Sequence, residues 1–228
     1  MVVAERMPDV VLVCGASGAL GRAVVDTFAA RGDRVVAAAR RPAGDLADGV
    51  TVEAVDLAVP SEVEALWDRL LERGEPPRWL VNAVGGFRAG TVTATEPDQY
   101  RFVHDLNLAT TWWSCRAAAR RMTPGGAIVN VSSRTALSGG AKAAAYAVAK
   151  AGVVRLTEVL ADELASSAIR VNAVLPSVMD TAGNRESMPP AALRAAVPTE
   201  DVASVIDFLC SDAARAVTGA VVPVYGLT

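Results

Sequence analysis

Short apolar, β-branched runs alternate along the chain with Ala-rich stretches of helical length. Continuous apolar runs are typical of strands that are buried on both faces of a parallel sheet. They predict strands at Val10–Cys14, Arg34–Ala39, Val50–Val55, Trp79–Ala83, Ala127–Val131, Ile169–Leu175 and Ala220–Tyr225. The intervening stretches predict helices at Ala19–Ala30, Pro60–Leu71, Pro97–Met122, Ala143–Ala165 and Thr199–Leu209.

This alternation predicts an α/β protein with a doubly wound, parallel, seven-stranded sheet in the order 3-2-1-4-5-6-7. The segment Ser177–Pro198 has no strong pattern and is expected to be irregular, with one helical turn. No repeat, linker or low-complexity segment interrupts the chain. Residues 1–228 are therefore expected to form a single domain.

Composition removes several classes of function. With 52% hydrophobic residues the chain is not disordered, and its net charge of −3 gives no electrostatic basis for binding nucleic acid or an anionic membrane. No apolar run reaches the ~18 residues of a membrane span, and Met1–Asp9 lacks the apolar core of a signal peptide. The 3 cysteines are widely spaced and His104 is the only histidine, so no disulfide framework or metal site is expected. We expect a soluble cytoplasmic protein.

A glycine-rich turn follows the first predicted strand and opens the first predicted helix. Gly15, Gly18 and Gly21 recur at three-residue steps, which allows a tight turn, a close approach to a pyrophosphate and close packing of helix on strand. The alternative is an ordinary glycine turn, but the position after the first strand favours a nucleotide site whose phosphates meet the helix start. The residues expected to contact the cofactor here are Gly15, Ser17, Gly18, Ala19, Leu20 and Gly21.

The end of the second predicted strand bears on the choice between NAD and NADP. An Asp or Glu usually binds the ribose 2′-hydroxyl at this point, and this chain has neither there. Arg40 offers a cation for a 2′-phosphate, which favours NADP(H) over NAD(H); the alternative is that Arg40 and Arg41 are simply solvated. Asp56, followed by Leu57 after the third strand, is placed to accept from an adenine amino group, although a turn role is the simpler interpretation.

Tyr146 and Lys150 lie four residues apart, so on a helix both side chains project from one face. A free tyrosine has a pKa of about 10. A neighbouring ammonium stabilises the phenolate and makes Tyr146 a usable proton donor and acceptor for a carbonyl oxygen. The pair alone is common on surface helices, but Ser132 and Ser133 follow the fifth strand, at the edge where doubly wound sheets bind ligands. The Ser133 hydroxyl could polarise the same oxygen.

Together these motifs resemble those of the short-chain dehydrogenase/reductase family, from the glycine turn to Thr218 and Gly219. The segment Asn82-Ala83-Val84-Gly85 stands in place of the family's Asn-Asn-Ala-Gly. The other matched positions are Asn107, Ser133, Tyr146, Lys150 and Pro176 through Thr181. The resemblance implies a Rossmann-type fold and an NAD(P)-dependent oxidoreductase that interconverts a carbonyl and a secondary alcohol.

The resemblance also implies roles for single residues. Ser133 would orient the substrate oxygen, and Tyr146 would donate or accept the proton. Lys150 would bind the nicotinamide ribose and lower the pKa of Tyr146, while Asn107 would hold a proton-relay water. The implied cofactor contacts beyond the glycine turn and Arg40 are Tyr146, Lys150, Asp56, Leu57, Asn82, Ala83, Val84, Gly85, Pro176 and, at the carboxamide, Met179 and Thr181.

The chain departs from the family's commonest pattern in the glycine turn, where Gly18 stands one place early and Ala19 follows it. This form resembles that of dihydropteridine reductases, which prefer NADH and carry an acid after the second strand that this chain lacks. Val84 and Ser177 also differ from the family pattern. Two alternatives to a carbonyl reductase remain: a non-catalytic nucleotide-binding sensor of the same fold, and an imine or enone (pteridine-like) reductase.

Trp112 and Trp113 lie on the long predicted helix, and their apolar surface predicts packing in the core or at a subunit interface. In the resembled family this helix and the one that carries Tyr146 commonly form a dimer interface, so a homodimer or homotetramer is expected. Arg88 and Arg134 flank the expected substrate entrance. They are candidates for binding an anionic substrate, with solvated arginines as the alternative.

Overall fold

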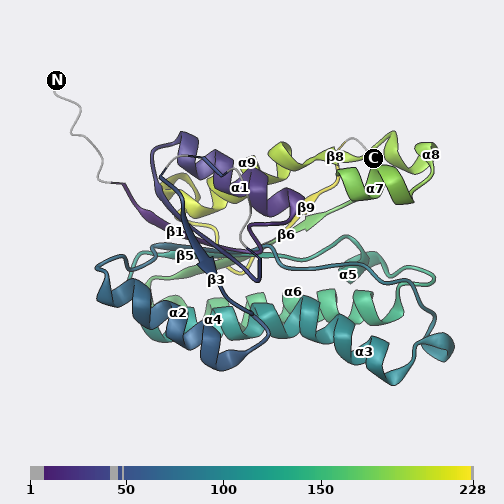
Figure 1. Ribbon diagram of the computed structural model, residues 1–228, viewed down its shortest axis with the longest axis horizontal. Helices are drawn as coiled ribbons and strands as arrows, with labels where there is room; N and C mark the ends of the chain where they lie inside the picture. The colour runs from purple at the N-terminus through teal and green to yellow at the C-terminus, as the bar shows by residue number, and fades with distance from the viewer. Residues whose placement is uncertain (1–7, 42–45, 48, 227–228) are drawn as a thin grey trace.

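A computed structural model describes residues 8–41, 46–47 and 49–226 as a three-layer α/β structure (Figure 1). The central sheet is parallel, and its strands follow the order β3-β2-β1-β4-β5-β6-β9, which confirms the predicted order with β9 as the seventh strand. Its strands are β1 (Val10–Cys14), β2 (Arg34–Ala39), β3 (Thr51–Ala54), β4 (Trp79–Asn82), β5 (Ala127–Val131), β6 (Arg170–Pro176) and β9 (Val221–Val224), and a separate pair is formed by β7 (Met179–Asp180) and β8 (Val197–Pro198). Residues 1–7, for which no signal peptide is expected, lie outside the described part.

Helices cover both faces of the sheet. Helices α1 and α9 pack against each other on one face, while α2, α4 and α6 cover the other (Figure 1). The helices are α1 (Ala19–Ala30), α2 (Pro60–Glu72), α3 (Pro97–His104), α4 (Thr110–Arg121), α5 (Thr135–Ser138), α6 (Ala144–Leu164), α7 (Ala182–Ser187), α8 (Pro190–Leu193) and α9 (Thr199–Cys210). None of the described helices combines the length and the apolar character that a membrane span requires.

The alternation of side chains along the strands builds two apolar cores. In β1, Leu12 packs with Trp67 of α2 on one face, and Val11 packs with Phe28 of α1 on the other. All four side chains are fully buried, and full burial of a single leucine or valine stabilises the fold by roughly 1.5–3 kcal/mol. Both faces of the sheet are therefore lined by apolar residues, which explains the continuous apolar runs.

The structure interrupts the predicted helix Pro97–Met122. Helix α3 ends at His104, a 5-residue π-helical turn spans Asp105–Ala109, and α4 follows. The turn places Asn107 in the interior, where its side chain bonds to the backbone of Gly86. The prediction of one continuous helix was wrong because this contact with the loop after β4 favours the wider turn, whereas the local sequence is compatible with a regular helix.

The segment Ser177–Pro198 is more ordered than predicted. Strands β7 and β8 pair in parallel, and α7 and α8 lie between them. The hydroxyl of Thr181 caps α7 by accepting from the Asn184 N–H at 3.2 Å, and the Asn184 side chain donates to the Met179 carbonyl at 2.8 Å. The prediction of one helical turn was wrong because polar contacts stabilise this segment. Such contacts leave no periodic pattern of apolar residues from which helices could be predicted.

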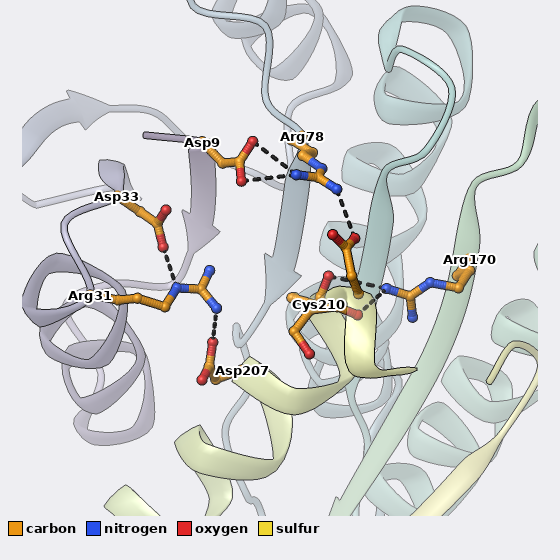
Figure 2. Close-up of polar contacts among 9 residues, drawn as sticks. Asp9, Arg31, Asp33, Arg78, Arg170, Asp207 and Cys210 are labelled. Carbon is orange, nitrogen blue, oxygen red and sulfur yellow. Dashed lines mark hydrogen bonds and ion pairs between the residues drawn. The ribbon is translucent and has the colours of Figure 1, made fainter. Parts of the chain in front are cut away.

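Arginines fix α9 to the amino ends of the strands (Figure 2). At the start of β6, Arg170 donates to the Leu209 carbonyl at 2.6 Å and to those of Cys210 and Ser211 at 3.0 and 3.1 Å. These carbonyls lie at the carboxyl end of α9, where the last turn of a helix leaves acceptors unpaired. Neighbouring ion pairs join Arg31 to Asp33 and Asp207, and Arg78 to Asp9 and Asp212.

Candidate active site

The glycine turn joins β1 to α1 at the carboxyl edge of the sheet. Gly15 has φ +88°, and a Cβ atom there would lie 2.8 Å from the Val84 nitrogen. A Cβ atom on Gly21 would collide with the Gly15 carbonyl. Glycine is therefore required at 15 for backbone conformation and at 21 for the packing of α1 against the turn. Gly18 has more room, since a Cβ atom there would meet only the Gly15 oxygen, at 3.4 Å.

A cleft of about 620 Å³ opens above this turn. The predicted residues that line it are Gly15, Ser17, Gly18, Arg40, Asp56, Leu57, Ala83, Val84 and Gly85. Sequence reasoning missed further lining residues, which are Ala39, Arg41, Val55, Ala58, Phe102, Asp105, Leu106 and Thr110. The first four of these residues are neighbours of predicted contacts at the ends of β2 and β3. The last four come from α3, the π-turn and α4, and no sequence pattern indicated that they would line a binding site. The dimensions and the glycine cradle fit a nucleotide.

The cleft wall beyond β2 is basic. Arg40 and Arg41 are exposed, and no ion pair among the described residues involves either of them. Asp56 lines the cleft opposite, but its carboxylate also accepts from the Ala58 N–H at 3.0 Å, which is a turn contact. The Arg40 guanidinium is thus available to an anion, and Asp56 combines the turn role with a place in the cleft.

Several predicted cofactor contacts lie outside this cleft. Ala19, Leu20 and Gly21 form the first turn of α1. Asn82 is buried, and its side chain donates to Asn130 Oδ1 at 2.9 Å, so it joins β4 to β5 within the sheet. Pro176, Met179 and Thr181 lie at and beyond the end of β6. Tyr146 and Lys150, also predicted to contact the cofactor, lie on α6 and do not line this cleft.

Ser133, Tyr146 and Lys150 meet at the carboxyl end of β5. Ser133 follows this strand, and it lies close enough to Tyr146, in the first turn of α6, to lower the pKa of that phenol. One turn later, Lys150 Nζ donates to the Val131 carbonyl at 2.9 Å. The preceding Ser132 donates to the Lys150 carbonyl at 2.8 Å, which fixes α6 against the strand. The expected trio is therefore assembled by contacts between β5 and α6.

Burial dominates the electrostatics of this trio. It raises the pKa of Tyr146 above 10.0, while the nearby Ser133 hydroxyl acts in the opposite direction. Burial also lowers the pKa of Lys150 from 10.5 to about 8. The expected lowering of the Tyr146 pKa by Lys150 is not observed, because loss of solvation of the phenolate dominates and the opposing contribution comes from Ser133.

In this structure the Asn107 side chain forms hydrogen bonds with backbone groups. Its Oδ1 accepts from the Gly86 N–H at 3.1 Å, and its Nδ2 donates to the carbonyls of Gly86 and Val103, both at 3.0 Å. A Cβ atom on Gly85 would lie 2.9 Å from Asn107 Oδ1 and 3.0 Å from Lys150 Nζ. Gly85 therefore allows the loop after β4, the π-turn and α6 to converge.

Aromatic side chains surround the entrance to the trio. The Phe87 ring packs edge-on against Tyr146 with centroids 5.3 Å apart. Both candidate entrance arginines lie over rings, Arg88 over Phe102 at 5.6 Å and Arg134 over Tyr225 at 4.9 Å. Among the described residues, no cluster of His, Cys, Asp and Glu could hold a metal ion. The site can therefore place a polar donor pair, Ser133 and Tyr146, at the end of a partly apolar opening.

Known proteins resemble this chain over nearly its whole length. A family model described as enoyl-(acyl carrier protein) reductase matches residues 15–226. An uncharacterised short-chain type dehydrogenase/reductase of Sinorhizobium fredii is 34% identical over 95% of the chain, which spans 43% of that protein. The 3-oxoacyl-[acyl-carrier-protein] reductase FabG of Pseudomonas aeruginosa is 33% identical over 95% of the chain and 96% of its own length.

Solved structures give the same picture. The aldohexose dehydrogenase of Thermoplasma acidophilum, in ligand-free form, superposes with a TM-score of 0.88 at 27% identity, over 95% of this chain and 92% of that one. The 3-ketoacyl-(acyl-carrier-protein) reductase of Brucella melitensis, complexed with NADH, gives a TM-score of 0.88 at 26% identity, over 96% and 97%. The fold, with its seven-stranded parallel sheet, is thus that of solved dehydrogenases and reductases.

Proposed function

Because the chain belongs to the short-chain dehydrogenase/reductase family, whose members are NAD(P)-dependent oxidoreductases, we propose that it interconverts a carbonyl and a secondary alcohol with Tyr146 as proton donor and acceptor. The observation that carries this proposal is the convergence of Ser133, Tyr146 and the buried Lys150 where α6 packs against the carboxyl end of β5. A hydroxyl pair of this kind, at the ligand-binding edge of the sheet, can hold one carbonyl oxygen between two donors.

Each residue has a distinct part in the proposed reduction. Ser133 donates a hydrogen bond to the carbonyl oxygen, which polarises the C=O bond. Tyr146 then delivers its proton to that oxygen as negative charge develops there, and a phenol with a raised pKa holds this proton at neutral pH. In the reverse direction the Tyr146 phenolate accepts the proton from the alcohol. Lys150, when protonated, stabilises that phenolate.

The nicotinamide cofactor supplies or accepts the hydride when it is bound. We propose that the glycine turn and the start of α1 hold its pyrophosphate, since Gly15, Ser17 and Gly18 line the cleft where α1 begins. Asp56 and Leu57 would contact the adenine, and Lys150 the nicotinamide ribose. Arg40 would hold a 2′-phosphate, which is the basis for proposing NADP(H) as the preferred cofactor.

The names of the relatives suggest substrates to try. They include 3-oxoacyl carrier thioesters, an aldohexose and, through the family model, an enoyl thioester. We propose a small carbonyl or alcohol substrate, and an enone is the second candidate because of that family-model description. A nucleotide sensor would bind the cofactor without turnover, so a substrate panel read by nicotinamide absorbance separates the two classes.

The decisive experiment replaces Tyr146 by phenylalanine. Tyr146→Phe keeps the ring and its packing on Phe87 but removes the transferable proton, so kcat should fall by roughly 10²–10⁴. The Kd for the nucleotide should stay within about twofold of wild type. The matched control is Tyr100→Phe, because Tyr100 is an exposed tyrosine on α3. Full turnover in Tyr146→Phe would overturn the assignment of the proton donor.

We also propose that the chain forms a homodimer or homotetramer. A narrow groove of about 260 Å³ runs along α4 and the π-turn, and it is almost entirely apolar. Its lining residues are His104, Asp105, Leu108, Ala109, Trp112 and Trp113. Trp112 is 48% exposed there, whereas Trp113 packs against the core. An exposed indole beside an apolar groove is typical of a surface covered by a partner.

A further inference from the structure

Ser133 is held by a residue that the sequence did not single out. Thr135, at the start of α5, donates to Ser133 Oγ twice, from its hydroxyl at 3.0 Å and from its backbone N–H at 3.3 Å. We propose that Thr135 is a positioning residue, which fixes the Ser133 hydroxyl as a hydrogen-bond donor toward the reacting oxygen. This inference rests on the proposed roles of Ser133 and Tyr146.

The argument starts from what a hydroxyl can do. A serine hydroxyl has one proton to donate and two lone pairs that accept. Thr135 supplies two donors to Ser133 Oγ, so both accepting positions are taken. The proton is then the one remaining function of Ser133. Ser133 lowers the pKa of the neighbouring Tyr146 phenol, which is the direction expected when its proton is directed toward the phenolate.

Thr135 can do this because its own position is fixed by the fold. The preceding Arg134 donates its backbone N–H to the Pro176 carbonyl at 3.0 Å, which ties the chain to the end of β6. The following Ala136 donates to the Ser133 carbonyl at 2.9 Å, which closes the first turn of α5. The Thr135 donors therefore point at Ser133 from a backbone that is anchored on both sides.

The bonds also form a directed chain. The Thr135 hydroxyl donates to Ser133, and Ser133 would in turn donate to Tyr146 or, during reaction, to the substrate oxygen. Each bond in such a chain polarises the next and strengthens it by roughly 10–30%. Loss of the Thr135 hydroxyl should weaken the donor strength of Ser133 and free its proton to rotate toward other acceptors. The expected effect is on Tyr146 chemistry, and nucleotide affinity should not change.

The surroundings of Thr135 allow an isosteric test. Its γ-methyl group lies toward Gly140, where an added Cβ atom would be 3.7 Å away. Thr135→Val keeps this methyl group and the backbone donor but removes the hydroxyl. Thr135→Ser keeps the hydroxyl and removes the methyl. Ser138→Ala is the matched control, because Ser138 is an exposed hydroxyl of the same helix that donates to the Arg134 carbonyl.

The first measurement is a titration of Tyr146 by ultraviolet absorbance of the tyrosinate, with Tyr146→Phe as the background. This measurement needs no substrate. Thr135→Val should raise the pKa of Tyr146 by about half a unit to one unit. Thr135→Ser and Ser138→Ala should leave it unchanged. Thermal unfolding of each variant identifies any general loss of structure, which the serine variant would share if the methyl packing were the cause.

The second measurement is kinetic. Thr135→Val should lower kcat about 3- to 10-fold with KM and nucleotide Kd within twofold, and it should move the pH profile upward with the Tyr146 pKa. The proposal is overturned if Thr135→Val titrates and turns over like wild type, or if Thr135→Ser loses as much. An active Tyr146→Phe enzyme would instead overturn the proposed function. An inactive Tyr146→Phe with a normal Thr135→Val rejects this inference alone.

Discussion

The ammonium group of Lys150 is buried without a carboxylate among its described contacts, and its Nζ donates to the Val131 carbonyl. Burial lowers its pKa from 10.5 to about 8. Between these values the unfolded chain binds more protons than the folded one, so stability rises with pH. The penalty at neutral pH is about 3 kcal/mol, from roughly 1.4 kcal/mol per pKa unit, and it disappears as the pH approaches 10.5.

This cost predicts that an inactive variant is more stable. Lys150→Met should raise the free energy of unfolding at pH 7 by about 1–2 kcal/mol, because removal of the penalty outweighs the loss of the donor to the Val131 carbonyl. The gain should vanish between pH 8 and 10.5, and near pH 10.5 the variant should be the less stable protein, because only the loss of the donor remains. Urea denaturation at both pH values measures it, with the exposed Lys142→Met as control. A less stable Lys150→Met at pH 7 would contradict the burial argument.

Arg40 carries the prediction of cofactor preference. A charge-assisted bond to a 2′-phosphate contributes roughly 1.5–3 kcal/mol, which corresponds to about a 10- to 100-fold preference for NADPH over NADH. Arg40→Ala should remove most of this preference by weakening NADPH binding while NADH binding is nearly unchanged. Kd values for both nucleotides, with Arg41→Ala as comparison, test it. A wild type that prefers NADH would show that Arg40 is not a phosphate ligand.

The spacing of residues along the sequence was sufficient to predict that some site residues lie together, but it was not sufficient for others. Tyr146 and Lys150 share a helix face because of their four-residue spacing, and Ser133 follows a strand whose end is set by its apolar run. The partners of Asn107 and Ser133 were not predictable in this way. Asn107 binds the Gly86 backbone because the loop after β4 lies beside it, and the local sequence does not predict where that loop lies. Thr135 belongs to no recurrent sequence motif that would identify it as a partner of Ser133.

At the scale of elements, Arg170 acts as the carboxyl cap of α9. Its guanidinium is partly buried and donates to the carbonyls of Leu209, Cys210 and Ser211. Hydrogen bonds that involve a charged group contribute about 1.5–3 kcal/mol each, and a cation at this end also favours the helix dipole. The contact therefore joins β6 and α9 at the edge opposite the cleft.

Arg170→Met should lower the free energy of unfolding by about 2–4 kcal/mol, since the three carbonyls lose their donor while the methionine restores part of the apolar contact. Urea denaturation measures this loss. Arg155→Met is a suitable control, because Arg155 is exposed and pairs with Glu158 on the surface of α6. Equal effects of the two variants would show that the cap contributes nothing specific.

Strands were predictable because burial on both faces makes each one a continuous apolar run. Helices α1, α2 and α9 were predictable because a buried stripe and a Pro or Gly boundary define them, and α6 because of its long Ala-rich stretch. The division of Pro97–Met122 was not, since Leu106 and Leu108 fit a regular helix as well as the π-turn. Long-range contacts, absent from any local pattern, decide between the two geometries.

At the scale of the whole molecule, the apolar groove on α4 predicts assembly. Trp112→Glu should convert the proposed dimer or tetramer to a smaller species, because a carboxylate cannot be buried there without a partner. Light scattering at micromolar concentration measures the mass. Phe208→Glu is the matched control, since Phe208 is also exposed but lies on α9, across the sheet. A monomeric wild type would refute the proposed assembly.

The crossover connections between parallel strands made the strand order predictable, and they also determine where the site lies. Crossover connections between parallel strands place helices on both faces and bring every strand's carboxyl end to one edge. Gly15 and Ser133 follow two of these strands and Pro176 ends a third, so all three lie at that edge. The pairing of β7 with β8 could not be predicted from the crossover rules, because these two strands form a separate small sheet.

The π-turn has a consequence for insertions and deletions. An α-helix advances about 100° per residue, and the wider turn takes up one extra residue, so α4 is out of phase with α3 by that angle. Deletion of Ala109 would therefore restore one continuous helix and leave the faces of α4 where they are. Trp112 would stay exposed, and Trp113 would stay packed against the core. The turn is thus a place where this helix can lose one residue and keep the same side chains against the core, whereas a deletion within α4 would rotate every later residue by about 100°.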